Sequence, residues 1–567
     1  MYRYALMLAA LPLPLLGDTL AIIHINDTHH HLFPYKSYNG IASAAYLIRN
    51  LRATYPNNLL FHAGDVFVGD FSFPYGLGRE ELKLLSLLGP DAITLGNHEL
   101  DITPDSLYAV LSDVGGFTTF LSANLRPDTI PLASLVRPYT TFTRSGRLIC
   151  VLGLTTNQFN LLSPAQQPVQ FENPVYIAQI YEDTFDVLGC DYRIILSHAG
   201  VDADSAIASS TRSYDLIVSG HTHACYDEPA KIINTSGDTT YFAEACQHYE
   251  AVGLWLIDMG TLRPVSHALF RLDAGSPVDG EFVDSLSALR ARIEARYGDV
   301  FSDFVAYTPR ELRNVPDSAR YLDTPLGNLI ADAIRDKASA DIGVVPYFYI
   351  AELPAGRITS NDVLLAFPYG LSETAQTGTN MRLLRATLRG ADLYRLLSIT
   401  QSFSDSTPIA QVSGMEYRFD PSQSPPLEVS DITVGGLPLD TNASYSLALD
   451  MGTLYLANLL GITPISVETT AYTMFSAMRE YFSEMILLNP TSEGRIAYKS
   501  AVALAEYHDD VPSHVRVVDG AVISDEPFSA YDVSGRLIAS GVRYLKVGGR
   551  RVIFVRTGGR VVKLLIR

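Results

Sequence analysis

Residues 95–101, Leu-Gly-Asn-His-Glu-Leu-Asp, contain the residue types that metal-assisted phosphate chemistry needs. Asn97 offers a neutral oxygen ligand beside the titratable imidazole of His98, and both follow a glycine turn. The preceding residues, 90–94, form a short apolar run that is typical of a strand. In isolation the tetrapeptide Gly-Asn-His-Glu is equally compatible with an ordinary turn, so its interpretation depends on other residues.

Two aspartates and a histidine follow two earlier predicted strands. Residues 20–25 are apolar and β-branched, and the chain continues into Asp27 and His29, whose spacing lets a carboxylate and an imidazole reach one cation. Residues 59–63 run into a glycine turn with Asp65 at its apex, where a carboxylate could bridge two metals. Taken alone, an aspartate in such a place is usually a turn residue.

Three more histidines follow two later predicted strands. Residues 192–196 lead to His198, and residues 215–219 lead into Gly-His-Thr-His, which carries His221 and His223. A single histidine at a strand end is more often structural. Three histidines from two strand ends favour a metal site.

The predicted strands alternate with segments of helical periodicity. Residues 40–55 and 80–88 have the helical pattern, and residues 120–124 and 148–154 form further predicted strands. Strand, ligand loop and helix recur in this order, which indicates an α/β layered fold with its site at the strand ends.

The composition is that of a large globular protein with an acidic surface. The chain has 567 residues, of which 47% are hydrophobic and 18% are charged, so we expect several domains with sizeable cores. Its 61 acidic and 42 basic residues give a net charge of −19, which argues against DNA or RNA as a partner. A small anionic substrate stays compatible with this charge, because bound divalent cations reverse the local field.

The first 17 residues predict export. Residues 1–17 have Arg3 near the start, an apolar run, and Gly17 before Asp18, as in a secretory signal; a buried first strand or a membrane anchor are the alternatives. The run is shorter than the ~20 residues that span a bilayer, and no later segment is apolar and long enough. We therefore expect an exported protein, periplasmic, cell-surface or extracellular, without an integral membrane segment after signal removal.

The four cysteines are too few for a disulfide scaffold. Cys225 and Cys246 could pair in an oxidising compartment, but free buried thiols are an equal alternative.

The chain carries five short segments with candidate ligands, and their types and order closely resemble those of the calcineurin-like metallophosphoesterases. The segments contain Asp27 and His29, Asp65, Asn97, His198, and His221 and His223. The resemblance implies a four-layer α/β/β/α domain that holds two divalent metal ions, such as zinc or manganese. One ion would be held by Asp27, His29, Asp65 and His223. The other would be held by Asp65, Asn97, His198 and His221, with Asp65 as the bridging ligand.

The family pattern also implies roles for the residues around these ligands. His98 would not bind metal but would stand over the reacting phosphate and stabilise the transition state or the leaving oxygen, and Asp101 would orient its ring. We interpret Glu99 as structural, and His30 and His31 as bystanders or as groups behind the ligands.

The second half of the chain resembles the C-terminal domain of bacterial and animal 5'-nucleotidases. The matching segments lie near residues 324–333, 354–359, 367–370, 411–414 and 493–496. An acidic helical segment, with Leu286, Leu289 and Ile293 on one face, would link the two halves. The expected divisions are a signal peptide (1–17), a catalytic domain (18–275), a linker helix (276–300), an α/β substrate domain (301–498) and a β-rich tail (499–567).

The second domain departs from its family at two places. Nucleotidases of this type carry an Asn-Gly-Gly-x-x-Arg-like segment whose arginine grips the anionic part of the substrate, and Ile350 stands where that arginine would fall. A Gly-Gly-Asp-Gly-Tyr-like segment that helps to hold the nucleoside is also missing, since residues 451–455 read Met-Gly-Thr-Leu-Tyr. Candidate substrate-binding side chains, which could equally be core residues, are Tyr347, Phe348, Tyr349 and Tyr455.

The tail beyond residue 499 predicts a different kind of structure. Residues 528–538 alternate and then turn, as a β-hairpin does, and further strands are predicted at residues 552–555 and 561–566. This resembles the small β-sandwich sorting domains of type IX secretion cargo and implies secretion machinery as a partner. An unrelated β module is the alternative.

The sequence therefore predicts a secreted, dinuclear-metal phosphoester hydrolase of the 5'-nucleotidase type. It would act on nucleotides or related small phosphoesters by attack of a metal-activated water. One alternative is a phosphomonoesterase, phosphodiesterase or nucleotide-sugar hydrolase with a different specificity. The other is a non-catalytic binding or surface protein, against which the intact ligand set argues, because buried carboxylates and imidazoles without a metal or partner are costly.

Overall fold

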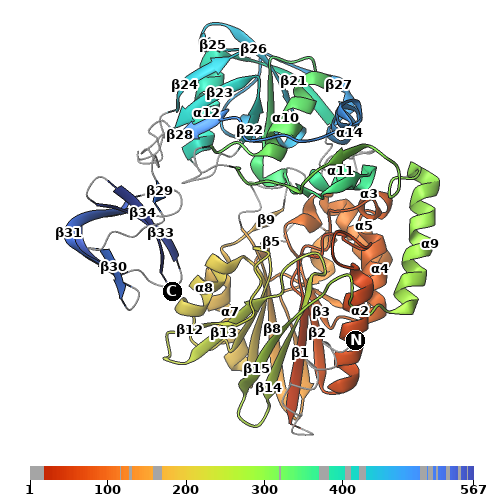
Figure 1. Cartoon of the computed structure of the whole chain (residues 1–567). Coiled ribbons are helices and arrows are strands. Elements are labelled where there is room, and N and C mark those ends of the chain that lie inside the picture. The colour runs from red at the N-terminus through yellow and green to blue at the C-terminus, as the bar shows by residue number, and fades with distance from the viewer. Residues whose placement is uncertain are drawn as a thin grey trace. The chain divides into compact units, whose positions relative to one another are not determined.

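The computed structural model shows that the chain folds into two compact units (Figure 1). Unit 1 comprises residues 1–305 and 358–381, and unit 2 comprises residues 306–357 and 382–567. The described residues are 18–114, 116–126, 131–157, 169–317, 321–368, 382–402, 410–419 and 429–498, together with the tail strands between residues 507 and 566. Only the backbone is described at residues 400–402, at residue 419 and in the tail. The predicted signal, residues 1–17, lies outside the described residues.

Unit 1 is built on two stacked sheets. The first has seven strands in the order β15 (Arg263–Arg271), β14 (Ala251–Asp258), β1 (Thr19–Ile25), β2 (Asn58–His62), β3 (Ala92–Thr94), β4 (Thr119–Leu121) and β6 (Val136–Arg137). The second has six, in the order β12 (Ala230–Ile233), β13 (Thr239–Glu244), β11 (Leu216–Ser219), β10 (Tyr192–His198), β8 (Arg147–Thr155) and β7 (Tyr139–Arg144). β1 to β4 pair in parallel, as do β8, β10, β11 and β13.

The main core lies between the two sheets. Successive side chains of a strand point to opposite faces, so Leu20 and Ile22 of β1 enter the inter-sheet core, where they meet residues such as Val151 and Ile194 of the second sheet. Ala21 and Ile23 are also fully buried and face the opposite side, which helices cover. Strands buried on both faces explain the continuous apolar runs in the sequence.

Helices cover the outer faces of both sheets (Figure 1). α2 (Ile41–Thr54), α4 (Arg79–Leu88) and α5 (Pro104–Val114) lie on the first sheet, and α7 (Pro174–Leu188) and α8 (Val201–Ser210) lie on the second. Phe185 of α7 and Ile207 of α8 pack on Leu152 and Ile217 of the second sheet. The α/β/β/α arrangement predicted from the resemblance is thereby confirmed. Short elements complete this part of the chain: α3 (Ser72–Gly76), the 3₁₀ turns η1 (His98–Leu100) and η2 (Pro131–Ser134), and the strand pair β5 (Leu125–Arg126) and β9 (Gln170–Phe171).

The predicted linker helix is α9 (Gly280–Tyr297), which packs within unit 1. Asp279 caps its start by accepting hydrogen bonds from the backbone N–H groups of Glu281 and Phe282. Arg49 of α2 forms ion pairs of 2.8 Å with both Asp279 and Glu281. The apolar face predicted from the sequence is buried, and it consists of Phe282, Leu286, Leu289 and Ile293.

A later segment of the chain returns to unit 1, where the sequence predicted a single boundary before residue 301. Residues 358–381 belong to this unit and include α11 (Ser360–Ala366). The Asn361 side chain accepts a hydrogen bond of 3.2 Å from the backbone N–H of Phe71, and Leu365 packs on Tyr35 and Tyr38. These contacts join residues about 300 positions apart, which periodicity in the sequence does not reveal.

All four cysteines form disulfides, which resolves the alternative that the sequence left open. Cys225 pairs with Cys246, and Cys150 of β8 pairs with Cys190, two residues before the start of β10. The second pairing was not predicted. Since β8 and β10 are adjacent parallel strands, the sheet itself brings Cys150 and Cys190 together.

Unit 2 contains a five-stranded sheet in the order β22 (Ala410–Ser413), β18 (Ile342–Pro346), β26 (Ser444–Leu449), β21 (Arg382–Arg389) and β27 (Ser466–Thr473). A four-stranded sheet has the order β25 (Leu437–Pro438), β24 (Val429–Val434), β23 (Met415–Phe419) and β28 (Ile496–Tyr498). The helices are α10 (Pro325–Lys337), α12 (Gly390–Ser402), α13 (Met451–Leu459) and α14 (Met474–Met485). Its short elements are β16 (Ala306–Thr308), β17 (Leu312–Arg313), η4 (Tyr347–Tyr349), β19 (Glu352–Leu353) and β20 (Gly356–Ile358).

The Glu-Gly-Arg motif, residues 493–495, lies directly before β28 and contacts α10 and the residues before α10. Arg495 forms a two-pronged ion pair with Asp332 of α10, at 2.8 and 2.9 Å. Asp323 accepts hydrogen bonds from the backbone N–H groups of Glu493 and Gly494. The motif that carries the resemblance therefore has a structural function here.

The tail forms a sheet of its own. Its strands are β29 (Tyr507–His508), β30 (Val515–Val518), β31 (Ala521–Tyr531), β32 (Leu537–Lys546), β33 (Arg551–Thr557) and β34 (Arg560–Ile566). β31 and β32 pair antiparallel, as do β33 and β34, so the part of the tail that the structure describes is all-β, as predicted. Of the helices that the structure describes, none combines the length and the apolarity that crossing a bilayer requires.

The separateness of the tail sheet predicts that it is dispensable for folding. Every backbone pairing of the described tail strands is with another tail strand. A chain that ends at Tyr498 should therefore fold and keep the main thermal transition of the full chain, measured by scanning calorimetry. Loss of cooperative unfolding in the shortened chain would contradict this independence.

Candidate metal centre

All seven predicted metal donors lie in unit 1, on loops at the carboxyl ends of parallel strands. The ends of β1, β2 and β3 adjoin in the first sheet, and those of β10 and β11 adjoin in the second. The contacts below join these two sets of loops at one edge of the stacked sheets. The donors are placed as follows: Asp27 and His29 after β1, Asp65 after β2, Asn97 after β3, His198 at the end of β10, and His221 and His223 after β11.

Asp27, His29 and His223 form the first donor cluster, with ligand atoms within 4.8 Å of one another. Nε2 of His223 lies 3.4 Å from Oδ1 of Asp27 and 3.2 Å from Nε2 of His29. Oδ2 of Asp65 lies 3.7 Å from Nε2 of His29, so a fourth donor adjoins this cluster. These are the four groups that the family pattern assigns to one metal.

Asp65, His198 and His221 form the second cluster. Nε2 of His198 lies 3.0 Å from Oδ2 of Asp65 and 3.2 Å from Oδ1 of Asn97. The same oxygen of Asp65 therefore adjoins donors of both clusters. A bridging role for Asp65 is compatible with this placement and stays a prediction.

Hydrogen bonds to backbone carbonyls orient two of the imidazoles. Nδ1 of His198 lies 2.7 Å from the carbonyl oxygen of Ala63, and Nδ1 of His29 lies 3.0 Å from that of Phe67. Because a carbonyl only accepts, Nδ1 must donate in both rings. Nε2 of each ring is thereby directed into the cluster as the ligand atom.

The loops that carry the donors adopt left-handed backbone conformations. φ is 50° at Asp27, 46° at His29, 56° at Asp65, 84° at His221 and 58° at His223. Such values are uncommon for residues other than glycine and occur preferentially at functional sites. They turn successive side chains toward one point instead of along a strand.

Two glycines permit the close approach of these loops. A Cβ at Gly96 would lie 2.1 Å from Oδ1 of Asp65, and a Cβ at Gly220 would lie 2.5 Å from the carbonyl oxygen of Ala63. Any larger residue would push the loops apart. The close contacts between these loops therefore require glycine at both positions.

The charges of the two buried carboxylates are balanced by imidazoles. Burial raises the pKa of Asp27, but His198 and His223 outweigh that effect and hold the pKa at about 2. The same competition, with His198 and His98 as the main opposing charges, holds the pKa of Asp65 well below its usual range. Among the described residues, the ion-pair partners of both carboxylates are all histidines.

The protonation states of the donor histidines are also compatible with binding a cation. Burial lowers the pKa of His29 and of His221 to about 4, so both rings are neutral and can act as ligands. In the other two donor rings the aspartates outweigh burial: Asp27 raises the pKa of His223, and Asp65 and Asp27 raise the pKa of His198 to about 10, which keeps a second proton on that ring. A cation can take the place of that proton, so the donor set fits divalent metal binding.

Glu99 and Asn26 hold the carboxylates in place. The Glu99 carboxylate accepts hydrogen bonds from the backbone N–H groups of Val66 at 2.6 Å and Gly96 at 2.5 Å, so it connects the Asp65 loop to the Asn97 loop. The interpretation of Glu99 as structural agrees with these contacts. Asn26, which the sequence reasoning did not assign, donates to Asp27 at 2.7 Å and to the carbonyl oxygen of Cys246 at 2.6 Å.

His98 is held at the mouth of the clusters by Asp101. Nδ1 of His98 lies 2.5 Å from Oδ2 of Asp101, which leaves Nε2 on the side of Asp65, 3.9 Å from its Oδ2. Burial disfavours the imidazolium, but Asp101 and Asp65 outweigh it and raise the pKa of His98 to about 9. His29, Asp65 and His98 also form a third group that could hold a metal. The geometry is therefore compatible with two roles for His98, a positively charged group beside the metal site or a metal ligand.

Exposure shows where the site opens. The side chains of Asp27, Asp65 and His198 are at most 2% exposed. Those of His98 and His223 are 19% and 38% exposed. A substrate would therefore approach past these two histidines.

A stacked pair of imidazoles adjoins the first cluster. The ring of His31 stacks on that of His248 with centroids 3.6 Å apart. The centroid of His248 lies 5.7 Å from that of His29, edge to face, and 6.1 Å from that of His223, with the rings tilted. His248 also has a left-handed φ of 53°. The sequence analysis did not identify His248 as a site residue, because no ligand motif surrounds it. The one signal in the sequence was its place shortly after a strand. His30 instead contacts Ser72, 2.8 Å away.

The substrate-binding candidates lie in unit 2. Tyr349 is buried, and a Cβ at Gly452, at the start of α13, would lie 2.9 Å from its hydroxyl. The hydroxyl of Tyr347 donates to the carbonyl oxygen of Asn314 at 2.9 Å. Phe348 is 42% exposed. Tyr347 and Tyr349 thus have structural contacts, while Phe348 and the partly buried Tyr455 of α13 present surface.

Two protein families match two successive parts of the chain. Residues 20–225 match the calcineurin-like phosphoesterase family, and residues 305–456 match the 5'-nucleotidase C-terminal domain. The chain thus contains a calcineurin-like phosphoesterase domain followed by a 5'-nucleotidase C-terminal domain. Both matches end before the tail, so the resemblance of the tail to a sorting domain stays a prediction.

Relatives of this phosphoesterase include nucleotide-directed enzymes. It is 27% identical over 461 residues to the trifunctional nucleotide phosphoesterase protein YfkN of Bacillus subtilis (strain 168), covering 73% of this chain but only 30% of that protein. It is 24% identical over 543 residues to the snake venom 5'-nucleotidase of Gloydius brevicauda, covering 85% of this chain and 89% of that protein. The predicted enzyme class, a metal-dependent phosphoric ester hydrolase, is confirmed by these relatives.

A solved structure shares the fold. The 5'-nucleotidase precursor of Thermus thermophilus matches with a TM-score of 0.75 and 24% identity, covering 85% of this chain and 99% of that one. This likeness supports the two-domain α/β fold of the phosphoesterase.

The shared position of Asp65 predicts that its loss affects both clusters. Asp65→Ala should lower the metal content, measured by elemental analysis, and abolish phosphoester hydrolysis, because each cluster loses a donor. Asp70→Ala is a matched control, since Asp70 is equally buried but accepts its hydrogen bonds from Ser72 and Leu32. Two metals per chain in Asp65→Ala would refute the bridging role.

Proposed function

We propose that this chain is an exported dinuclear-metal hydrolase that acts on nucleotides or related small phosphoesters. The observation that carries the proposal is the convergence of two donor clusters on Asp65, with His98 beside them. The family match and the named activities of the relatives support it. An acidic chain without such cations would repel an anionic substrate.

The residues of the two clusters would each hold one divalent cation. Bound there, the cations would place positive charge beside a phosphoryl oxygen and make a nearby water more acidic. Asp27 and Asp65 supply the negative charge that retains them, and Asn26 and Glu99 keep these carboxylates and their loops in place. Four imidazoles and the amide oxygen of Asn97 complete the donor set.

His98 would act on the substrate through its Nε2. Asp101 holds Nδ1, so the ring keeps a fixed orientation and a raised pKa. A charged imidazole at the mouth of the site can donate a hydrogen bond to a phosphoryl oxygen or give a proton to the leaving oxygen. Asp101 positions the ring and does not itself meet the substrate.

His98→Ala tests this role. We expect kcat to fall by ~10²–10⁴, the usual range for lost acid–base or electrostatic assistance, with metal content nearly unchanged. Asp101→Asn should cause a smaller loss of the same kind, because the ring remains but loses its orienting charge. If His98→Ala loses metal together with activity, His98 belongs to the ligand shell.

Unit 2 supports a specificity that differs from that of a strict 5'-nucleotidase. Ile350 is 7% exposed and aliphatic, where the family pattern has an arginine for the anionic part of the substrate. An aliphatic side chain cannot form charge-assisted hydrogen bonds. This departure favours a second candidate function, a phosphomonoesterase, phosphodiesterase or nucleotide-sugar hydrolase with weak nucleoside selectivity.

Competing substrates distinguish the two specificities. We expect kcat/KM for AMP to exceed that for an aryl phosphate by less than about a hundredfold, which corresponds to ~2.7 kcal/mol in transition-state binding. Both assays are made with added Mn²⁺ on the same preparation. A larger preference for AMP would mean that nucleoside recognition has been kept by other residues.

Export is the remaining part of the proposal. Two disulfides in unit 1 suit an oxidising compartment, and one relative is a venom protein. The tail would be the element that secretion machinery recognises. Fractionation of the producing cell, with the full chain and with a chain ending at Tyr498, tests both statements.

A further inference from the structure

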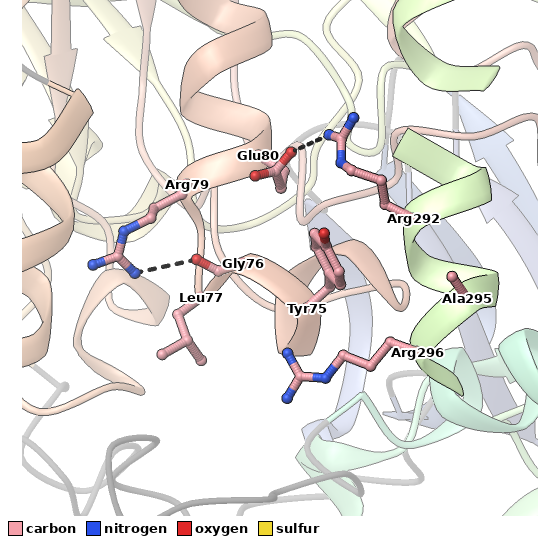
Figure 2. Close-up of a pocket in the computed structure, with 8 residues that line it drawn as sticks. All are labelled: Tyr75, Gly76, Leu77, Arg79, Glu80, Arg292, Ala295 and Arg296. Atoms are coloured by element: carbon pink, nitrogen blue, oxygen red, sulfur yellow. Dashed lines mark hydrogen bonds and ion pairs between the residues drawn. The ribbon is translucent and has the colours of Figure 1, made fainter. Parts of the chain in front are cut away.

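A pocket of about 570 Å³ lies in unit 1 between α9 and the segment that joins α3 to α4 (Figure 2). None of the donors of the metal centre lines it. Its walls include three arginines, Arg79, Arg292 and Arg296, together with Glu80, Tyr75 and Leu77. Figure 2 shows Arg292 and Arg296 reaching from α9 toward the opposite wall, one on each side of Tyr75.

The pocket concentrates positive charge on a strongly acidic chain. Arg292 pairs with Glu80 at 2.9 Å, and the same carboxylate also meets Lys83 at 3.3 Å. Arg79 pairs with Asp113 at 3.1 Å, and Asp113 is 58% exposed. Three cationic side chains thus meet two carboxylates, while the whole chain carries a net charge of −19.

The backbone adds to this positive field. α4 begins at the pocket wall, and its N-cap, Gly78, supplies no side-chain hydrogen bond. The first N–H groups of a helix lack intrahelical partners and favour an anion nearby. The N–H groups of the helix add to the positive field of the arginines. Without the arginines they would not make a binding site.

The arrangement fits a phosphate-bearing ligand of more than one phosphate. A guanidinium group presents paired N–H donors that match the oxygens of a phosphate, and two such groups flank Tyr75. The volume far exceeds that of a single phosphate, and the ring of Tyr75 and the side chain of Leu77 provide an apolar wall. We propose that this pocket binds the diphosphate group of a small molecule, at a site separate from the metal centre.

The diphosphate could belong to an inorganic ion or to a nucleotide. Titration calorimetry distinguishes these two kinds of ligand. The probes are methylenediphosphonate and α,β-methylene-ADP, which resist hydrolysis, with inorganic phosphate and adenosine for comparison. The full chain is first freed of metal with a chelator and then of the chelator, because the metal centre without cations should not retain the probe. We expect saturable binding of both diphosphate probes at one site, and weaker binding of phosphate and adenosine.

Substitutions assign the binding to the pocket. Arg292→Ser and Arg296→Ser should each raise the Kd for methylenediphosphonate at least about tenfold, since each removes a charged two-pronged contact. Arg263→Ser is the matched control, because Arg263, like Arg292, is 51% exposed and paired with a carboxylate, but lies on β15. Arg292→Lys, which keeps the charge without the fork, serves if Arg292→Ser does not fold.

A change of opposite sign distinguishes a ligand site from a structural ion pair. Glu80→Gln should lower the Kd, because it removes a negative charge and frees Arg292 for the ligand. The proposal is overturned by the absence of saturable binding, by equal losses in Arg292→Ser and Arg263→Ser, or by weaker binding in Glu80→Gln. It does not rest on the catalytic activity, which all of these experiments leave aside.

Discussion

The structure of unit 1 depends on keeping two carboxylates, Asp27 and Asp65, ionised in the protein interior. A buried charge is costly unless partners surround it, and here those partners are imidazoles, backbone N–H groups and the amide of Asn26. The backbone N–H of His221 donates to Asp27, and that of His98 donates to Asp65. The same groups that stabilise the carboxylates are thus placed to share them with cations.

This requirement explains the unusual backbone of the loops. Five of the seven donors have a left-handed φ, a conformation that costs free energy for residues with a Cβ. The cost is tolerated because strands buried on both faces fix the ends of each loop, and because Glu99 bonds to the N–H groups of neighbouring loops. Rigid sheets therefore sustain a strained but preorganised site.

The metal donors and the departures from the nucleotidase pattern lie in different parts of the chain. Every donor of the clusters belongs to unit 1, whereas the departures from the nucleotidase pattern, at Ile350 and at residues 451–455, belong to unit 2. On the specificity proposed above, the hydrolytic site would be kept in unit 1 while substrate preference would depend on unit 2. The helix α9, expected only to link the two, is packed into unit 1 and lines the arginine pocket.

The sequence alone determined the strands, the ligand loops and the order of the domains, because buried strands are continuous apolar runs and the ligand motifs follow them directly. It also indicated the seven donors and the pair His98 and Asp101. The tertiary structure decided the pairing of Cys150 with Cys190, the return of residues 358–381 to unit 1, and the places of Asn26 and His248 beside the donors. These depend on contacts between residues far apart in the chain, which leave no periodic pattern, since only the stacking of two sheets brings the loops together.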